Sequence, residues 1–385
     1  MVIINSKERL VKVLNNETPD QIPWSSLVNK YFLASLEKKY GKIDPLDFLL
    51  EIGADAIPWI SFKTKSKNVE VTTYINGKKV KEVNNNWFGE IFDYIELDSF
   101  RGSNNCVIDK EYIGFGGILT SSYIYKAEAD TVFLKDFMIK GIKDYKIFKK
   151  MIMDLEYLDI HNDYKNALEK INGKGLPFIG LPGSPMIELM EFFMGAERFL
   201  YSLTDNKREI EDLLDAMRAK YIKCYKFYSN LECEAIISIE DAGAIFYSPQ
   251  MFNHYIKPVL SDYRDIIKSS GKIHIIHSCG HLKNIIPMLK EIEPDCLESV
   301  SPPPIGSIEI DEIQKQLPGI CIMGGIPAHV FRYSLADFKE YIKSLILKVK
   351  GKGNFILSSG DSTPADAKIE NLKAIPDLIR KYGKY

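Results

Sequence analysis

Along most of the chain, short apolar runs alternate with longer amphipathic segments, and no other feature of the sequence restricts the possible folds as strongly. The apolar runs predict strands at 177–182, 234–241, 272–280, 295–300, 320–326 and 354–361. The segments between them predict helices at 186–193, 205–229, 249–270, 282–292 and 335–349. Because consecutive parallel strands need a crossover that a helix usually provides, this order predicts parallel βαβ units.

Two architectures are built from such units, a closed barrel and an open doubly wound sheet. The G-x-G-x-x-G fingerprint that a dinucleotide-binding sheet carries after its first strand is absent from the sequence. Polar residues instead end several of the predicted strands, namely Glu240, Asp241, His277, Cys279, Glu298 and Asp361. A barrel brings such strand ends to one mouth, where the active sites of barrels lie. We therefore expect an α/β fold of the (β/α)8 TIM barrel type.

An amphipathic helix is predicted ahead of the barrel, over residues 6–16. Ser6 is the expected N-cap, and Leu10 and Leu14 share one face of the helix. Between 68 and 125 the chain becomes β-rich, and Asn-Gly at 76 and 77 predicts a two-residue hairpin turn. We interpret the chain as one barrel domain over 1–385, with an N-terminal helical extension and this β-rich insertion.

Charge and composition exclude several classes of function. Fifty basic residues face 52 acidic ones, and a net charge of -2 offers no field that would attract nucleic acid or an anionic membrane. No stretch reaches the ~18 to 20 apolar residues of a membrane span, and the N-terminus does not resemble a signal peptide. Six cysteines are scattered without a pairing pattern. We expect a cytoplasmic protein that acts on a small molecule; whether it forms a homodimer stays open.

His277 and Cys279 are the strongest candidates for chemistry. On an extended chain residues i and i+2 point to the same side, so the imidazole and the thiol converge. Zinc accepts such N and S ligands, and a third ligand could come from Asp361, Glu298 or Glu240. The alternative is that His277 is a hydrogen-bonded strand-end residue and Cys279 a small buried hydrophobe.

The acid pair Glu240 and Asp241 ends one predicted strand, and only one of the two can face the barrel axis. Glu240 shares a side with Ile236 and Ser238, so we take it as the preferred metal or substrate ligand. Asp241 is then a pocket or helix-capping residue, and both are candidate catalytic residues. The alternative for each is a solvated loop acid. Asp361 could equally cap the helix that follows it or contact the substrate.

Two more histidines lie close to His277. His274 has the opposite parity and should face outward, toward a helix. His281 follows Gly280 at the expected start of a helix. For both, a structural role is the simpler interpretation.

Five stretches carry a resemblance that goes beyond these patterns. They are KERLVKVLNNETPDQIPW at 7–24, EIGADAIP at 51–58, DAGAIFYSPQMFNHYIKPVL at 241–260, HSCGHLKNIIPMLKEIEPDCLESV at 277–300 and ILSSGDSTPADAKIENLKA at 356–374. In these stretches the chain resembles the uroporphyrinogen decarboxylase superfamily, and in particular its zinc-dependent, corrinoid-linked methyltransferase branch. They span nearly the whole chain, so the resemblance implies the barrel fold throughout.

The resemblance implies a zinc-dependent methyltransferase that works with a corrinoid. Its His-x-Cys metal pair corresponds to His277 and Cys279, but the later cysteine of the branch is replaced here by Asp361 after Gly360. A carboxylate in place of a thiolate makes a harder site and a better Lewis acid, which favours a methoxy donor. Glu298 loosely resembles a carboxylate ligand of cobalamin-independent methionine synthase. The sequence has no D-x-H-x-x-G corrinoid motif, so a partner protein would supply the corrinoid.

Two other functions remain as alternatives. One is metal-independent decarboxylation, which true decarboxylases support with an arginine-rich N-terminal segment; the corresponding VNKYF at 28–32 has only Lys30. The other is a non-catalytic protein that binds a corrinoid or a metal. The methyl donor, the methyl acceptor and the direction of transfer are left open, with methoxy, thiol and pterin compounds as the candidate substrates.

Overall fold

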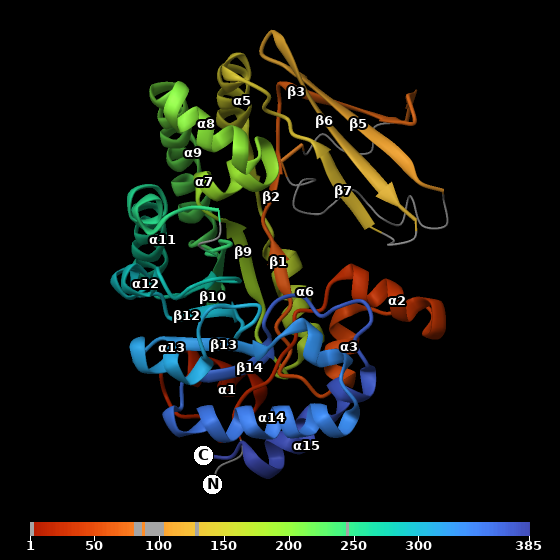
Figure 1. Ribbon diagram of the computed structural model, residues 1–385, viewed down its shortest axis with the longest axis vertical. Coiled ribbons are helices and arrows are strands. Elements are labelled where there is room, and N and C mark those ends of the chain that lie inside the picture. Colours follow the sequence, from red (N-terminus) through yellow and green to blue (C-terminus); the bar gives the residue numbers. More distant parts are fainter. Residues whose placement is uncertain (1–3, 81–86, 89–103, 128–130, 244–245) are drawn as a thin grey trace. The chain divides into compact units, whose positions relative to one another are not determined.

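A computed structural model of the chain describes residues 4–80, 87–88, 104–127, 131–243 and 246–385 (Figure 1). The chain forms two compact units. The first comprises Met1–Ser61, His161–Leu181 and Ser229–Tyr385, and the second comprises Phe62–Ile160 and Pro182–Tyr228. The second unit therefore extends beyond the β-rich insertion expected at 68–125. The interpretation of the whole chain as one domain stays a prediction.

The first unit is built on a curled, seven-stranded parallel sheet that resembles a TIM barrel (Figure 1). Its strands follow the order β1 (Trp59–Ser61), β9 (Phe178–Pro182), β10 (Ala235–Ile239), β11 (Ile273–His277), β12 (Cys296–Val300), β13 (Cys321–Ile326) and β14 (Phe355–Ser359). All six strands predicted from the apolar runs are present. The parallel βαβ order is confirmed as well.

A short segment around Trp24 joins the two edges of this sheet. On one side the Leu357 N–H of β14 donates to the Pro23 carbonyl at 2.9 Å, and the Ser25 N–H donates to the Leu357 carbonyl at 3.0 Å. On the other side the Asp55 N–H, just ahead of β1, donates to the Trp24 carbonyl at 2.7 Å. Strand β14 therefore has a backbone partner at its outer edge, and the residues just ahead of β1 are bonded to the same segment; barrels avoid open edges by such pairing. The predicted α/β fold of TIM-barrel type is confirmed as a curled seven-stranded parallel sheet, and the closed eight-stranded form stays a prediction.

Helices precede the first strand of this unit and alternate with the later ones. They are α1 (Ser6–Leu14), α2 (Lys30–Tyr40), α3 (Pro45–Glu51), α6 (His161–Ile171), α10 (Pro249–Met251) with the π-helix η3 (Phe252–Ile256) and α11 (Lys257–Ser269), α12 (Ile286–Ile292), α13 (Ile310–Gln316), α14 (Leu335–Val349) and α15 (Ile369–Tyr382). Short 3-10 helices lie at η4 (Ala328–Arg332) and η5 (Lys350–Lys352). None of the helices in the described part of the chain is long and apolar enough to cross a bilayer.

The first helix begins differently from the expectation. Asn5, not Ser6, is the N-cap of α1: its side chain accepts the Glu8 N–H at 2.9 Å, and the Glu8 carboxylate accepts the Asn5 N–H at 3.1 Å. These two bonds form a capping box, which satisfies two backbone donors at once. Asn and Ser are both good N-cap residues. The second hydrogen bond, between the Glu8 carboxylate and the Asn5 N–H, favours Asn5 as the cap.

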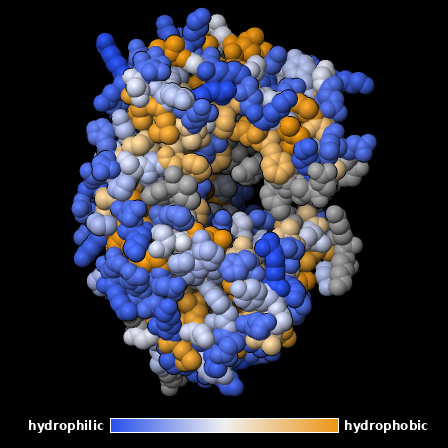
Figure 2. Space-filling view, in the orientation of Figure 1, coloured by the Kyte–Doolittle hydropathy of each residue, from blue (hydrophilic) through white to orange (hydrophobic). Residues whose placement is uncertain are grey.

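Alternate residues of the strands form the core of the barrel-like unit. The cluster takes Ile57, Leu176, Phe178, Ala235, Ile237, Ile273, Ile275, Cys296, Cys321, Met323 and Ile356 from the strands and the residues just before them, and Leu10, Val13 and Leu14 from α1. Helix α1 therefore covers the N-terminal ends of the strands. The C-terminal ends are left for polar residues. The visible surface of this unit is mainly hydrophilic with scattered apolar side chains (Figure 2).

The second unit contains an antiparallel sheet and a group of helices. The sheet has the order β4 (Lys78–Lys79), β3 (Val69–Ile75), β5 (Cys106–Gly114), β6 (Gly117–Lys126) and β7 (Thr131–Asp136), and β2 (Lys63–Lys65) pairs separately with β8 (Glu156–Leu158). The predicted hairpin turn is confirmed, since Asn76 and Gly77 have φ of 49° and 77° between β3 and β4. The helices are α5 (Ile142–Asp154), α7 (Pro185–Glu188) with the π-helix η2 (Leu189–Phe193), α8 (Ala196–Asp205) and α9 (Lys207–Tyr228).

Candidate metal centre

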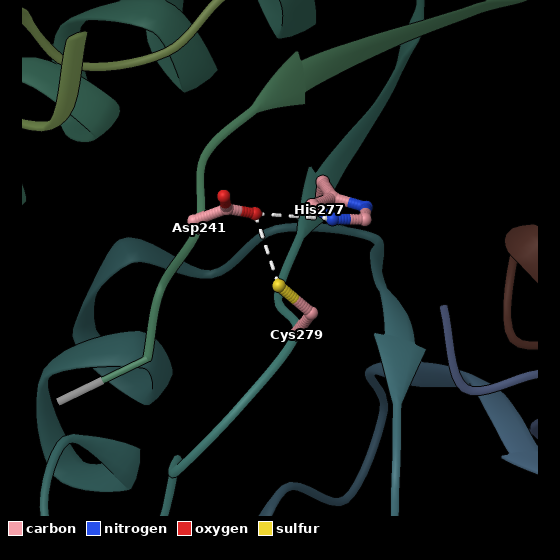
Figure 3. Close-up of side chains that lie close together, drawn as sticks. All are labelled: Asp241, His277 and Cys279. Atoms are coloured by element: carbon pink, nitrogen blue, oxygen red, sulfur yellow. Dashed lines mark hydrogen bonds and ion pairs between the residues drawn. The ribbon is translucent and has the colours of Figure 1, made fainter. Parts of the chain in front are cut away.

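Three potential metal ligands converge at the C-terminal ends of β10 and β11. The Asp241 Oδ1 atom lies 3.2 Å from His277 Nε2 and 3.0 Å from Cys279 Sγ (Figure 3). All three ligand atoms lie within 4.8 Å of one another. We call Asp241, His277 and Cys279 the ligand group.

The alternation of the strands explains this convergence. Ile273 and Ile275 of β11 point into the core, so His277 and Cys279 continue the same inward face. The thiol and the imidazole therefore meet as the i, i+2 spacing predicted. His274, of opposite parity, is fully buried outside the core cluster, and its Nε2 is hydrogen-bonded to Ser238 Oγ at 2.9 Å.

The acid in the ligand group is not the one that sequence parity favoured. Ala235 and Ile237 are the inward residues of β10, and Asp241 continues their parity. Glu240 shares its parity with Ser238, which lies outside the core cluster; Glu240 is fully buried and is not one of the three grouped residues. The structure thus brings Asp241, not Glu240, to His277 and Cys279. Catalytic roles for both acids stay predictions.

Glu298, expected as a ligand, lies behind His277 instead. It occupies the β12 position in register with His277, is fully buried, and accepts a hydrogen bond from His277 Nδ1 at 2.6 Å. The Ser299 hydroxyl donates to its other oxygen at 2.9 Å. Because a carboxylate accepts, the Nδ1 atom carries the proton and Nε2 is the nitrogen that faces the ligand group. Metal-bound histidines are held by such carboxylates.

Asp361 does not join the ligand group. It follows β14 as expected, but its side chain is exposed and accepts the Ser362 N–H at 2.6 Å. His281 is also exposed and lies outside the group. A ligand role for Asp361 or for Glu298 stays a prediction.

Burial and charge shift the pKa values within the ligand group. Burial lowers the pKa of His277, but the Glu298 charge and the hydrogen bonds to Asp241, Cys279 and Glu298 raise it well above its usual value. Burial, aided by Asp241, raises the pKa of Cys279 to about 12, against the effect of His277. Without a cation, the proton on His277 therefore offsets part of the negative charge of the neighbouring carboxylates, and the Cys279 thiol keeps its proton.

The donor set fits zinc. It offers one imidazole nitrogen, one sulfur and one carboxylate oxygen, the three ligand types that zinc accepts. Ligand atoms of a tetrahedral zinc lie about 3.5 Å from one another, since each is ~2.0 to 2.3 Å from the ion. The Asp241 Oδ1 atom lies 3.2 Å from His277 Nε2 and 3.0 Å from Cys279 Sγ, both close to that value. A cation at this point would replace the two protons on His277 and Cys279.

One aromatic neighbour of the ligand group was missed in the sequence. The indole of Trp59, on β1, lies edge-to-face with the His277 ring, with the ring centroids 5.8 Å apart. Trp59 is half-buried and packs partly against the barrel core. Its position directly after Pro58, at the first residue of β1, was the available signal.

Comparisons with known proteins agree with this architecture. The sequence model of the family described as uroporphyrinogen decarboxylase (URO-D) matches residues 125–382. A methyltransferase from Methanosarcina mazei superposes with a TM-score of 0.62 and 13% identity, covering 99% of this chain and 99% of that chain. At this identity the likeness concerns the fold alone. Comparison with the curated proteins gives no match.

More distant solved structures add little. A thiamine phosphate pyrophosphorylase from Pyrococcus furiosus aligns with a TM-score of 0.20 and 8% identity, over 42% of this chain and 90% of that chain. A GH5-4 broad specificity endoglucanase from an uncultured bacterium aligns with a TM-score of 0.36 and 8% identity, over 63% of this chain and 85% of that chain. Likeness at this level carries no argument about function.

Proposed function

The chain belongs to the uroporphyrinogen decarboxylase (URO-D) family, and on this premise we propose that it is a zinc-dependent methyltransferase. The methyl group moves between a small substrate, a methoxy, thiol or pterin compound, and a corrinoid carried by a partner protein. The single observation that carries the proposal is the convergence of Asp241, His277 and Cys279 at the C-terminal ends of the strands. The fold likeness to a methyltransferase supports it.

The number of protein donors supports a catalytic rather than a structural ion. Structural zinc sites are closed by four protein ligands, whereas catalytic sites have three and leave a position for substrate. The described residues supply three donors within reach of one point. When bound, zinc would act as a Lewis acid toward a heteroatom of the substrate.

Each residue of the centre has a task that follows from its contacts. Glu298 holds the Nδ1 proton of His277, which fixes the ring with Nε2 toward the ligand group. Cys279 supplies sulfur once its proton has left. Asp241 supplies oxygen in place of a second thiolate, and a harder donor set suits an oxygen-bearing substrate. We therefore favour a methoxy compound as the methyl donor.

A partner protein completes the reaction in this proposal. The sequence has no D-x-H-x-x-G motif with which to hold a corrinoid itself. Barrel enzymes bind their substrates at the C-terminal ends of the strands, where the ligand group lies. We propose that the corrinoid protein approaches from that side.

Metal analysis tests the proposal. Purified wild type should contain one zinc per chain, and His277→Ala, Cys279→Ala and Asp241→Asn should each lose it. His254→Ala, at an exposed position of η3, is the matched control and should keep the metal. Asp361→Asn should also keep it if Asp241 is the carboxylate that completes the site. Full zinc content in either His277→Ala or Cys279→Ala would refute the proposal.

Metal-independent decarboxylation is the second candidate, because the family takes its description from a decarboxylase. It predicts that a carboxylated substrate loses CO₂ in the presence of a strong chelator. The methyltransferase proposal predicts that chelation abolishes methyl transfer and that added zinc restores it. Measuring both activities with and without chelator separates the two.

A further inference from the structure

Two glycines touch each other next to the ligand group. Gly243 lies two residues after Asp241, and Gly280 directly follows Cys279. A Cβ atom built on Gly243 would lie 3.0 Å from the Cys279 carbonyl oxygen and 3.4 Å from Gly280 Cα. A Cβ atom on Gly280 would lie 3.1 Å from Gly243 Cα. The loops after β10 and β11 thus meet backbone to backbone.

The contact between Gly243 and Gly280 cannot be relieved by a side-chain rotation. In each case the neighbour is backbone, which cannot rotate away as a flexible side chain would. The Gly280 carbonyl oxygen would also lie 3.4 Å from a Cβ atom on Gly306, in the loop after β12. The loop that carries Cys279 is therefore confined on two sides.

The segment around Asp241 transmits a displacement of Gly243. Three short-range backbone hydrogen bonds follow one another in it. The N–H groups of Glu240, Ala242 and Gly243 donate to the carbonyl oxygens of Ser238, Glu240 and Asp241, at 2.9, 2.8 and 2.6 Å respectively. These bonds make the segment a series of tight turns. Moving Gly243 by a few tenths of an ångström therefore moves the Asp241 backbone as well.

We propose that Gly243 and Gly280 are positioning residues of the metal centre, because their contact sets the distance between the Asp241 carboxylate and the Cys279 thiol. The inference rests on the metal site proposed above. In a metal site the distance from each ligand atom to the ion stays within about 0.2 Å of its usual value. A methyl group between the loops imposes a shift of similar size or larger, so it separates the two ligands without removing either.

The first test compares Gly243→Ala with Gly351→Ala. Gly351 has open space around its Cβ position and no left-handed backbone, so it controls for the glycine-to-alanine change itself. We expect the zinc affinity of Gly243→Ala, measured by competition with a chromophoric chelator, to fall at least tenfold. The cobalt(II)-substituted protein should show altered thiolate-to-metal absorption bands. Gly351→Ala should match wild type in both measurements.

The second test separates contact from backbone strain. Gly280 and Gly271 both have a left-handed φ, 95° and 70°, but only Gly280 has a neighbour near its Cβ position. Gly280→Ala and Gly271→Ala should both lower the melting temperature through strain. Only Gly280→Ala should weaken zinc binding and change the cobalt spectrum. This pair decides the question if Gly243→Ala does not fold.

The outcomes distinguish this inference from the proposed function. If wild type binds no zinc, the metal site itself fails. If wild type binds zinc, and Gly243→Ala and Gly280→Ala bind it with unchanged affinity and an unchanged cobalt spectrum, only the positioning role is overturned. Equal losses of affinity in Gly280→Ala and Gly271→Ala would also overturn it, since strain alone would then suffice.

Discussion

At the residue scale, Glu298 shows how a group outside the ligand group can control it. Its carboxylate is fully buried and bonded to the imidazole nitrogen that points away from Asp241. The sequence indicated an acid near the metal, but its function depends on the register of β11 and β12, in which Glu298 faces His277. No local pattern in either strand specifies that register.

We predict that Glu298→Gln weakens zinc binding by about 10- to 100-fold, because the amide orients the ring less firmly and makes it a weaker base. The measurement is a competition titration. Glu291→Gln, at an exposed position of α12 paired with Lys257, is the control and should bind as wild type. Loss as complete as in His277→Ala would instead identify Glu298 as a direct ligand.

His274 gives a prediction about pH. Burial, helped by Lys268 and Arg264, lowers the pKa of His274 to about 3 from the ordinary 6.5. Between these values the unfolded chain binds a proton at this position and the folded chain does not, so stability falls as pH falls from about 6.5 toward 3. We predict that His274→Gln removes a slope of up to ~1.4 kcal/mol per pH unit from the free energy of unfolding in that window.

Urea denaturation at several pH values measures that slope. His254→Gln, at an exposed position, should leave the slope unchanged. Comparing variants at each pH cancels the contribution of the ligand group, which is intact in all of them. An unchanged slope in His274→Gln would show that the buried ring is not the source of acid sensitivity.

At the element scale, the limits of sequence reasoning have a definite physical cause. Strand β10 is buried on both faces, as parallel strands of a barrel are, so its apolar run shows which residues form a strand but not which side faces the axis. For that reason the parity of Glu240 and Asp241 could not be read correctly. Helix α12 begins at Ile286, later than expected, with Pro287 in its first turn, where proline is favoured.

Buried charges tie α1 to the segment that joins the sheet edges. Arg9 Nη1 donates to Asp55 at 2.7 Å, while its Nε and Nη2 atoms bind the two oxygens of Asp20 at 2.7 and 2.9 Å. The other oxygen of Asp55 accepts the Trp24 N–H at 2.9 Å. The Arg9 guanidinium therefore binds Asp20, which precedes the Trp24 segment, and Asp55, which is hydrogen-bonded to that segment.

We predict that Arg9→Met lowers the free energy of unfolding by on the order of 3 kcal/mol, because it leaves two carboxylates without their cation, one of them buried. Chemical denaturation measures the loss. Lys12→Met, which breaks only the exposed pair with Glu17, should cost less than about 1 kcal/mol. Equal effects of the two changes would mean that the buried network contributes nothing to stability.

At the scale of the whole molecule, the barrel-like sheet and its strand order were predictable, since alternating strands and helices leave few topologies. The division into two compact units was not. The second unit is assembled from two stretches separated by residues 161–181; taken alone, the first resembles a β-rich insertion and the second a helical crossover connection. The candidate site was predictable in position and in its histidine and cysteine, because strand ends meet at one mouth.

The joint between Trp24 and β14 has a consequence for how the protein is made. Pro23 and Ser25 lie 334 and 332 residues before their partner Leu357 in the sequence. Until Leu357 has been synthesised the early segment has no partner in β14, so this joint can form only after the preceding strands of the sheet have been made. A polypeptide that stops before Phe355 would keep one ladder edge open and invite pairing with other chains.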